Sequence, residues 1–149
     1  MAFLPWMPRT LWNAGYGQPF YVVAENISSA SLNLWAEGNS EGYGTVSFEV
    51  TDAAGVKTVV RKVDREWRKN IIQGERLMPG GLQVRAIRYA SESGKESEWE
   101  KFPFSMKEPG KEVTLRAVFE QKAADWSEKL KPWAGKAVSA PVKVVLRTQ

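Results

Sequence analysis

The chain has 149 residues, a length that suits one domain with its own hydrophobic core. Its 21 Lys or Arg and 17 Asp or Glu are interspersed and leave a formal net charge of only +4, which predicts no strong field for a polyanion. Histidine and cysteine are both absent, which excludes disulfides, thiolate metal sites, Cys nucleophiles, Ser-His-Asp triads and the HExxH zinc motif.

The first 18 residues show no hydrophobic periodicity and contain two prolines and two glycines. They predict an irregular N-terminal arm that lies on a single domain formed by residues 19–149. This start lacks the basic and apolar regions of an ordinary signal peptide, so a cytoplasmic location and export of a chain whose start was trimmed both stay open. No apolar run reaches the roughly 18 residues of a membrane span.

Two strands are predicted next, in residues 20–27 and 32–36. The first places Phe20, Val22 and Ala24 on one face, against Tyr21, Val23 and Glu25 on the other. This alternation is typical of a strand with one buried face. In the second strand Trp35 falls on the face opposite Leu32 and Leu34, which makes it the tryptophan most expected to be exposed. The Gly-rich residues 38–44 predict a loop.

Residues 44–63 predict a β-hairpin. Val46, Phe48 and Val50 alternate with polar residues, and the return strand repeats the alternation after residues 52–55, Asp-Ala-Ala-Gly. Asp52 can accept hydrogen bonds from the backbone of a turn, and Gly55 supplies a positive φ at its end. A four-residue connection of this kind commonly closes a hairpin.

The second half of the chain predicts fewer regular elements. Residues 64–81 read as an edge or crossover segment, and residues 82–89 as a strand with apolar residues on both faces, which suggests a bulge or two-sided burial. Residues 99–104 predict a short edge strand, residues 113–120 a strong strand, and residues 142–147 the last one. Residues 123–130 contain helix formers and predict one short helical turn.

Strands spaced at roughly ten residues, with Gly and Pro between them and hardly any helix, favour an all-β, antiparallel β-sandwich, with a closed barrel as the alternative. The strings FYVVAENIS, LNLWAEG, GYGTVSFEVTDAAG and ERLMPGG resemble small bacterial immunoglobulin-like domains, among them the bacterial intracellular proteinase inhibitor domain. The shared motifs are D-x-x-G at residues 52–55 and L-x-P-G at residues 77–80. The resemblance spans residues 20–89 and implies an immunoglobulin-like sandwich, with proteinase inhibition as a possible activity. The later TLRAVFE and WAGKAVSAPVKV are similar to uncharacterised bacterial single-domain proteins.

The chain is rich in tryptophan, with seven copies, and several aromatic residues fall in predicted loops. The candidate binding residues are Trp12, Tyr16, Trp35, Tyr43, Trp126 and Trp133. Large rigid aromatic side chains at one end of a sandwich could grip a protein partner or stack on a sugar ring. The alternative is that they close the ends of the sandwich and hold the arm in place.

Other candidate sites are weaker. The basic residues of 61–69 are interleaved with acids, which favours a solvated edge over a phosphate-binding surface, so no nucleic-acid partner is expected. Glu96, Glu98 and Glu100 could share a strand face, but a glycosidase pair is not expected in so charged a hairpin. No cofactor or metal motif occurs. The expected function is a non-enzymatic binding module with a protein partner; a carbohydrate-binding module and a proteinase inhibitor are the alternatives.

Overall fold

The computed structural model describes residues 2–4, 20–68, 70–71, 73–87, 98–100, 112–123 and 130–145, with only the backbone described for residues 2–4, Phe20 and Val145. Their strands are β1 (Ala2–Leu4), β2 (Phe20–Glu25), β3 (Leu32–Trp35), β4 (Val46–Thr51), β5 (Lys57–Val60), β6 (Gly74–Leu77), β7 (Leu82–Ile87), β8 (Glu112–Gln121), β9 (Gly135–Val138) and β10 (Val142–Val145). One short helix, α1 (Ser40–Tyr43), lies between β3 and β4. All pairings between these strands are antiparallel, which confirms the all-β prediction.

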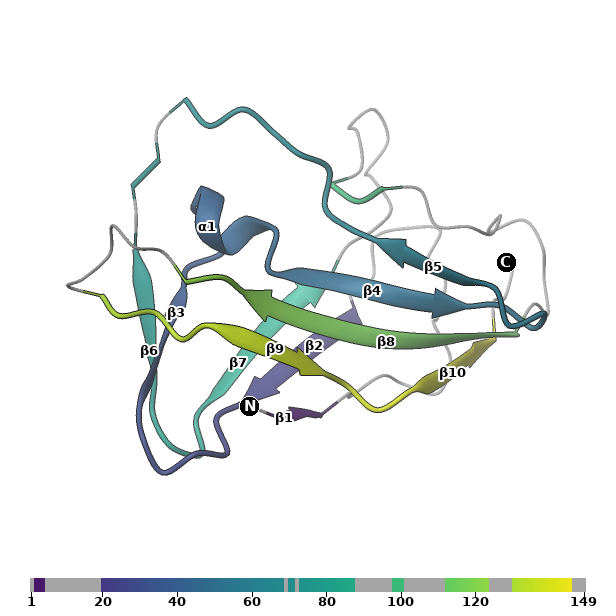
Figure 1. Cartoon of the computed structure of the whole chain (residues 1–149), viewed down its shortest axis with the longest axis horizontal. Helices are drawn as coiled ribbons and strands as arrows, with labels where there is room; N and C mark the ends of the chain where they lie inside the picture. The colour runs from purple at the N-terminus through teal and green to yellow at the C-terminus, as the bar shows by residue number, and fades with distance from the viewer. Residues whose placement is uncertain are drawn as a thin grey trace.

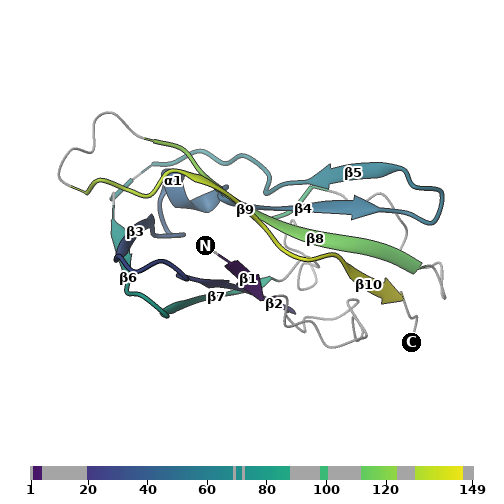
Figure 2. The same cartoon turned by 60° about the horizontal axis from the view of Figure 1, so that its bottom comes forward.

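The strands form two layers (Figures 1 and 2). One layer has the order β1-β2-β7, and the other has the order β10-β8-β4-β5, with β9 also paired to β8. β9 and β10 both pair with β8, along the same edge of it. They are separated at Ser139, whose backbone N–H donates to the carbonyl oxygen of Ala117 and whose hydroxyl accepts from the Ala117 N–H. The two strands therefore act as one edge strand with a local interruption.

The core lies between the two layers. Every second residue of β4 is buried, and Phe48 at its centre has no exposed surface. β8, beside β4 in the same layer, adds its buried side chains to the same face, and β2 supplies Val22 and Ala24 from the opposite layer. Trp99 packs on Phe48 with their ring centroids 5.1 Å apart. Burying a side chain of this size stabilises the fold by about 2–3 kcal/mol.

The predicted hairpin is confirmed as β4 and β5, with Val50 opposite Thr58. Asp52 closes the turn as expected, because its Oδ1 accepts hydrogen bonds of 2.9 Å from the N–H groups of Ala54 and Val56. Gly55 has a φ of 82°, the conformation that favours glycine. Beyond β5, the chain around Lys62 pairs with Trp99, so the predicted edge strand begins there, while residues 101–104 lie outside the described residues.

The β2–β7 pair continues as the β3–β6 pair around a sharp corner formed by residues 26–31 and 78–81. Asn26, with no exposed surface, holds this corner. Its Nδ2 donates to the carbonyl oxygens of Ala30 (2.8 Å) and Leu77 (3.0 Å), and its Oδ1 accepts from the N–H (3.0 Å) and hydroxyl (2.7 Å) of Ser28. Gly80, at a φ of 70°, completes the L-x-P-G turn by donating its N–H to the Asn26 carbonyl.

Two predictions about the strands are wrong. The arm is not wholly irregular, because Ala2–Leu4 pairs with β2; residues 5–19 lie outside the described residues. Burial of β7 is one-sided: Leu82 and Val84 are more than half exposed, whereas Arg85 and Ile87 are buried. The polar side chain of Arg85, not an apolar one, fills the inner position. The helical turn predicted at residues 123–130 falls largely on residues 124–129, outside the described residues.

Candidate binding surfaces

The outward side of the β2–β7 pair is mostly apolar, with the half-buried Glu25 opposite Leu82 at one end. Cross-strand pairing places Tyr21 opposite Ala86 and Val23 opposite Val84, so these four residues share a face with Leu82. Tyr21 is 39% exposed, Leu82 55% and Val84 57%. We call Tyr21, Val23, Leu82, Val84 and Ala86 the outer face. Adjacent exposed apolar residues of this kind mark an interaction surface more often than scattered ones do.

The sequence contains the signal for the outer face, but it predicts a bulge or burial on both sides of the strand rather than an exposed apolar face. Leu82, Val84 and Ala86 share a face in the strand pattern, and an apolar face is ordinarily taken to point inward. In the structure the inner positions of β7 are held by Gln83, Arg85 and Ile87. Arg85 can be buried because its Nη1 donates to Thr45 and Gly42, far away in the chain, whereas the half-buried Gln83 donates to the nearby Glu75.

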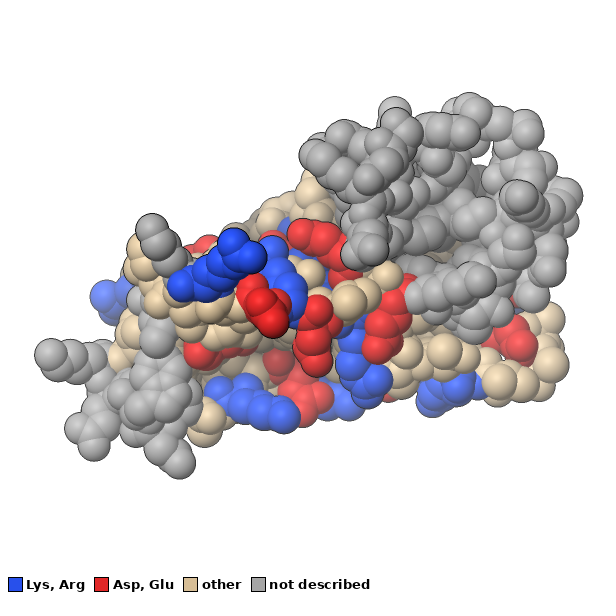
Figure 3. Space-filling model, turned by 90° about the horizontal axis from the view of Figure 1, so that it is seen from above, with Lys and Arg blue, Asp and Glu red and all other residues tan. Residues whose placement is uncertain are grey.

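Charged side chains of both signs surround the segment after β5. Seen from above the view of Figure 1, Lys and Arg intermingle with Asp and Glu instead of gathering by sign (Figure 3). Arg65 stacks between two rings, with its guanidinium carbon 4.2 Å from the ring centre of Tyr43 and 4.0 Å from that of Trp67. The two rings meet edge to face at 5.6 Å. The guanidinium of Arg65 is therefore occupied by contacts within the chain.

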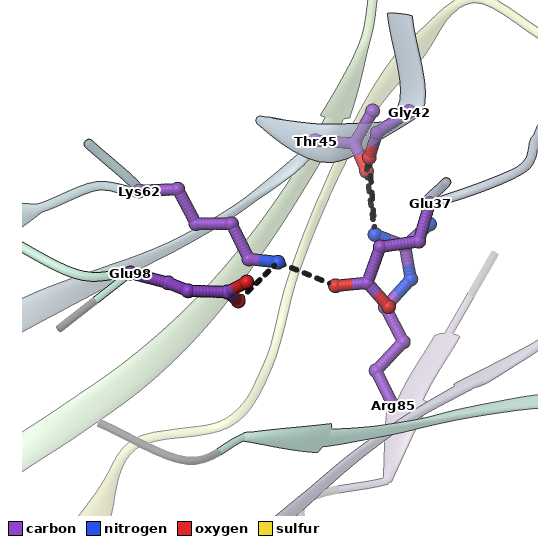
Figure 4. A network of polar contacts seen from close by, with 6 residues as sticks. All are labelled: Glu37, Gly42, Thr45, Lys62, Arg85 and Glu98. Atoms are coloured by element: carbon purple, nitrogen blue, oxygen red, sulfur yellow. Dashed lines mark hydrogen bonds and ion pairs between the residues drawn. The ribbon is translucent and has the colours of Figure 1, made fainter. Parts of the chain in front are cut away.

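Lys62 is the centre of a polar cluster between the layers (Figure 4). Its side chain is only 5% exposed, and its Nζ lies 2.6 Å from a carboxylate oxygen of Glu37 and 3.4 Å from one of Glu98. The same Nζ lies 4.4 Å from the ring centre of Tyr43. Burial raises the pKa of Tyr43, and the nearby Glu98 carboxylate adds to that rise. The cluster ties together three segments that are distant in the chain.

Replacing Lys62 by methionine is expected to lower the free energy of unfolding by about 2 kcal/mol, because Glu37 and Glu98 then lose their shared cation. The matched control is Lys57→Met, since the Lys57 Nζ lies 3.9 Å from Glu49 with a side chain 60% exposed, and its loss should cost under about 0.5 kcal/mol. Urea unfolding followed by fluorescence measures both. Equal losses in the two variants would contradict a stabilising role for the Lys62 cluster.

Arg85 is the second charged residue between the layers. It rises from β7 towards α1 (Figure 4), where its Nη1 donates to the hydroxyl of Thr45 (2.9 Å) and the carbonyl oxygen of Gly42 (3.3 Å). Burial lowers the pKa of Arg85, and the carboxylates of Glu37 and Glu75 oppose that effect. Its Nε and Nη2 are buried without a hydrogen-bond partner.

The aromatic residues predicted to bind a partner are not brought together in the described part of the chain. Trp35 is 2% exposed, so the expectation that it is exposed is wrong; Leu34 beside it is equally buried, because both faces of β3 are covered. Tyr43 is buried under Lys62 and Arg65. Trp133 packs on Phe119 with ring centroids 6.0 Å apart.

These three residues pack against other parts of the domain. Trp133 also donates its N–H to the carbonyl oxygen of Asn33, which fastens the end of β3. Trp12, Tyr16 and Trp126 lie outside the described residues, so their role in binding stays a prediction. The residues that the sequence interpretation missed are those of the outer face.

Within the described ranges, no three acidic residues gather as a metal site would require. Glu98 pairs with Lys62, and Glu100 accepts a hydrogen bond from the backbone of Arg61. No helix in that part of the chain has the length and apolar character needed to cross a membrane. No protein-family model, curated protein or solved structure matches this chain.

Proposed function

We propose that this chain is a non-enzymatic interaction domain that binds a protein partner through the outer face. The observation that carries the proposal is the group of adjacent, exposed apolar residues on β2 and β7, with Tyr21 among them. Protein interfaces have such a composition at their centre, and a tyrosine offers a large apolar surface with a hydroxyl at its tip. We assign the fold to the immunoglobulin-like sandwiches as part of the same proposal, supported by its two antiparallel layers.

The other partner classes have less support. A sugar platform needs exposed aromatic ring faces, whereas Trp35, Tyr43 and Trp133 pack against protein. A nucleic-acid surface needs a basic patch, whereas Lys62 and Arg65 are engaged within the chain. Proteinase inhibition rests on the resemblance of residues 20–89 alone. The apolar chemistry of the outer face thus favours a protein surface with apolar side chains of its own.

The test places a photo-crosslinking phenylalanine analogue at position 21, or at position 56 as the control, in the full chain. Val56 is 60% exposed but lies in the turn before β5, away from the outer face. After irradiation in lysate of the source organism, we expect a heteromeric adduct of discrete mass from position 21 and none from position 56. The protein in the adduct is then expressed and its affinity measured directly.

In that binding measurement by calorimetry, Tyr21→Lys is expected to weaken the affinity at least about 30-fold, as at an interface hot spot, and Val56→Lys to leave it unchanged. Unchanged affinity in Tyr21→Lys, or no heteromeric adduct, would rule out the outer face. A fluorescence change with soluble glycans, lost in the same variant, would favour the carbohydrate-binding alternative instead.

A further inference from the structure

Glu25 is the charged residue on the outward side of the β2–β7 pair. It ends β2, is half-buried, and lies in the cross-strand register between two apolar residues, Ala2 of β1 and Leu82 of β7. Val23 and then Tyr21 follow it along the same side of β2. A strand rises about 3.4 Å per residue, so the backbone positions of Glu25 and Tyr21 are about 14 Å apart. The acid and the tyrosine therefore mark opposite ends of the apolar surface.

The carboxylate of Glu25 has no partner in the described part of the chain. Neither an ion pair nor a hydrogen bond joins it to another residue there. The strands of its layer, β1, β2 and β7, contain a single basic residue, Arg85. That guanidinium is buried between the layers, where it donates to Thr45 and Gly42. The layer thus has no cation of its own to neutralise Glu25.

A protein that covers the outer face also covers this carboxylate, because Leu82, 55% exposed, lies directly opposite Glu25. Covering an ionised carboxylate removes water from it, and this loss opposes binding unless a new partner compensates. A charge-assisted hydrogen bond from a cation is the strongest compensation that a protein surface can offer. Since the layer supplies no such cation, the binding partner has to supply it.

We propose that the protein partner of the outer face places an arginine or lysine side chain against Glu25, beside an apolar patch that covers Leu82, Val84 and Tyr21. This inference rests on the proposed function and adds the chemistry of the partner. An arginine suits the position best, because its planar guanidinium can bind both carboxylate oxygens while its methylene groups lie on apolar surface such as that of Leu82. The single charge at one end also favours one direction of docking along the strands.

The same charge argues against other occupants of the outer face. A second copy of this chain, stacked face to face, would bring another unpaired acid and no base, so neither copy would neutralise the other. An anionic membrane surface would be repelled by the carboxylate. A partner with a basic residue next to apolar side chains is the occupant that satisfies both the apolar residues and Glu25.

The first test maps the partner residues that lie next to Glu25. It uses the protein captured by the photo-crosslinking analogue at position 21, with the analogue moved to position 82, opposite Glu25 in the register. Mass spectrometry of the new adduct identifies the segment of the partner that is joined. We expect this segment to contain an arginine or lysine within a few residues of the crosslink. A segment without a basic residue would overturn the inference.

The second test measures affinity for the same expressed protein by calorimetry. Glu25→Gln is expected to weaken binding about 10-fold and Glu25→Lys about 100-fold. The matched control is Glu49→Gln, which changes a half-buried acid in the other layer that lies 3.9 Å from Lys57, and it should leave the affinity unchanged. Raising the salt concentration from about 0.05 M to about 0.5 M should weaken binding of the wild-type chain more than binding of Glu25→Gln, because salt screens the ion pair.

The two proposals can be told apart by their variants. Unchanged affinity in Glu25→Gln, combined with the loss expected in Tyr21→Lys, would overturn this inference and leave the proposed function standing. No adduct from position 21, or unchanged affinity in Tyr21→Lys, would rule out the outer face and this inference with it. Far-UV circular dichroism and urea unfolding confirm that each variant is folded before its affinity is compared.

Discussion

Replacing Gly42 by alanine is expected to lower the free energy of unfolding by about 3 kcal/mol, at the upper end of what overpacking costs. A Cβ at this position would overlap the backbone carbonyl of Ala36. Backbone cannot yield as the tip of a flexible side chain does, so α1 has to move away from β3. That movement also displaces the Gly42 carbonyl oxygen, which accepts hydrogen bonds from Thr45 (2.8 Å) and Arg85 (3.3 Å).

The control is two residues away. A Cβ at Gly44 would meet no atom within 4 Å, and this residue has a φ of −90°, which any residue adopts. Gly44→Ala should therefore change the free energy of unfolding by less than about 0.5 kcal/mol. Chemical unfolding of both variants, followed by intrinsic fluorescence, measures the difference. Equal stability of the two variants would show that α1 does not lie against Ala36 in solution.

Replacing Asn26 by alanine is expected to cost about 3 kcal/mol, because it removes the four side-chain hydrogen bonds that hold the corner and leaves the buried Leu77 carbonyl oxygen without that donor. Ser28→Ala is the matched control, since it removes only the hydroxyl, which bonds to Asn26 and to the carbonyl of Ala30. Ser28→Ala should lower the free energy of unfolding by about 1 kcal/mol. Thermal and urea unfolding measure both changes.

Asn26→Asp separates the donor role from the acceptor role. The carboxylate keeps the acceptor for Ser28 but faces the carbonyl oxygens of Ala30 and Leu77, so the charged form is disfavoured in the fold and the folded-state pKa lies above the unfolded value of about 3.9. A raised pKa gives stability that is present below the unfolded pKa and lost as pH rises through the folded one. The loss in free energy of unfolding caused by Asn26→Asp should therefore become smaller at low pH. A pH-independent deficit would contradict the hydrogen bonds from Nδ2.

The elements that the sequence predicts correctly are governed by neighbours in the chain. The β4–β5 hairpin follows from residues 46–60 alone, because Asp52 and Gly55 supply the turn and alternation supplies the buried face. The two faces predicted for β2 are distinct for the same reason: Val22 and Ala24 are buried, and Tyr21 is exposed. In such local patterns, residues close together in the chain determine the turn and the buried face of the strand.

The failures all depend on distant partners. Arg85 can occupy an inner position of β7 only because Thr45 and Gly42, some forty residues earlier, accept its hydrogen bonds. Trp35 is buried although it lies on the side of β3 that was expected to be exposed. Its backbone N–H donates to the side-chain oxygen of Gln121, far along the chain. The helix α1 is four residues long, too short for periodicity, and only its cap, Asn39, was a usable signal. Short stretches of a single sequence do not show contacts between residues so far apart in the chain.

The pairing of β2 with β7 joins positions roughly sixty residues apart, whereas β4 and β5 are neighbours. During synthesis at about 5–20 residues per second, β2 leaves the ribosome several seconds before its partner exists. Throughout that interval Val22 and Ala24 lack the opposite layer that covers them, and the backbone of β2 can pair only with the three-residue β1. A nascent chain of this protein is thus most prone to aggregate after its first hairpin has formed and before residue 87 emerges, the interval in which a holdase chaperone would serve it best.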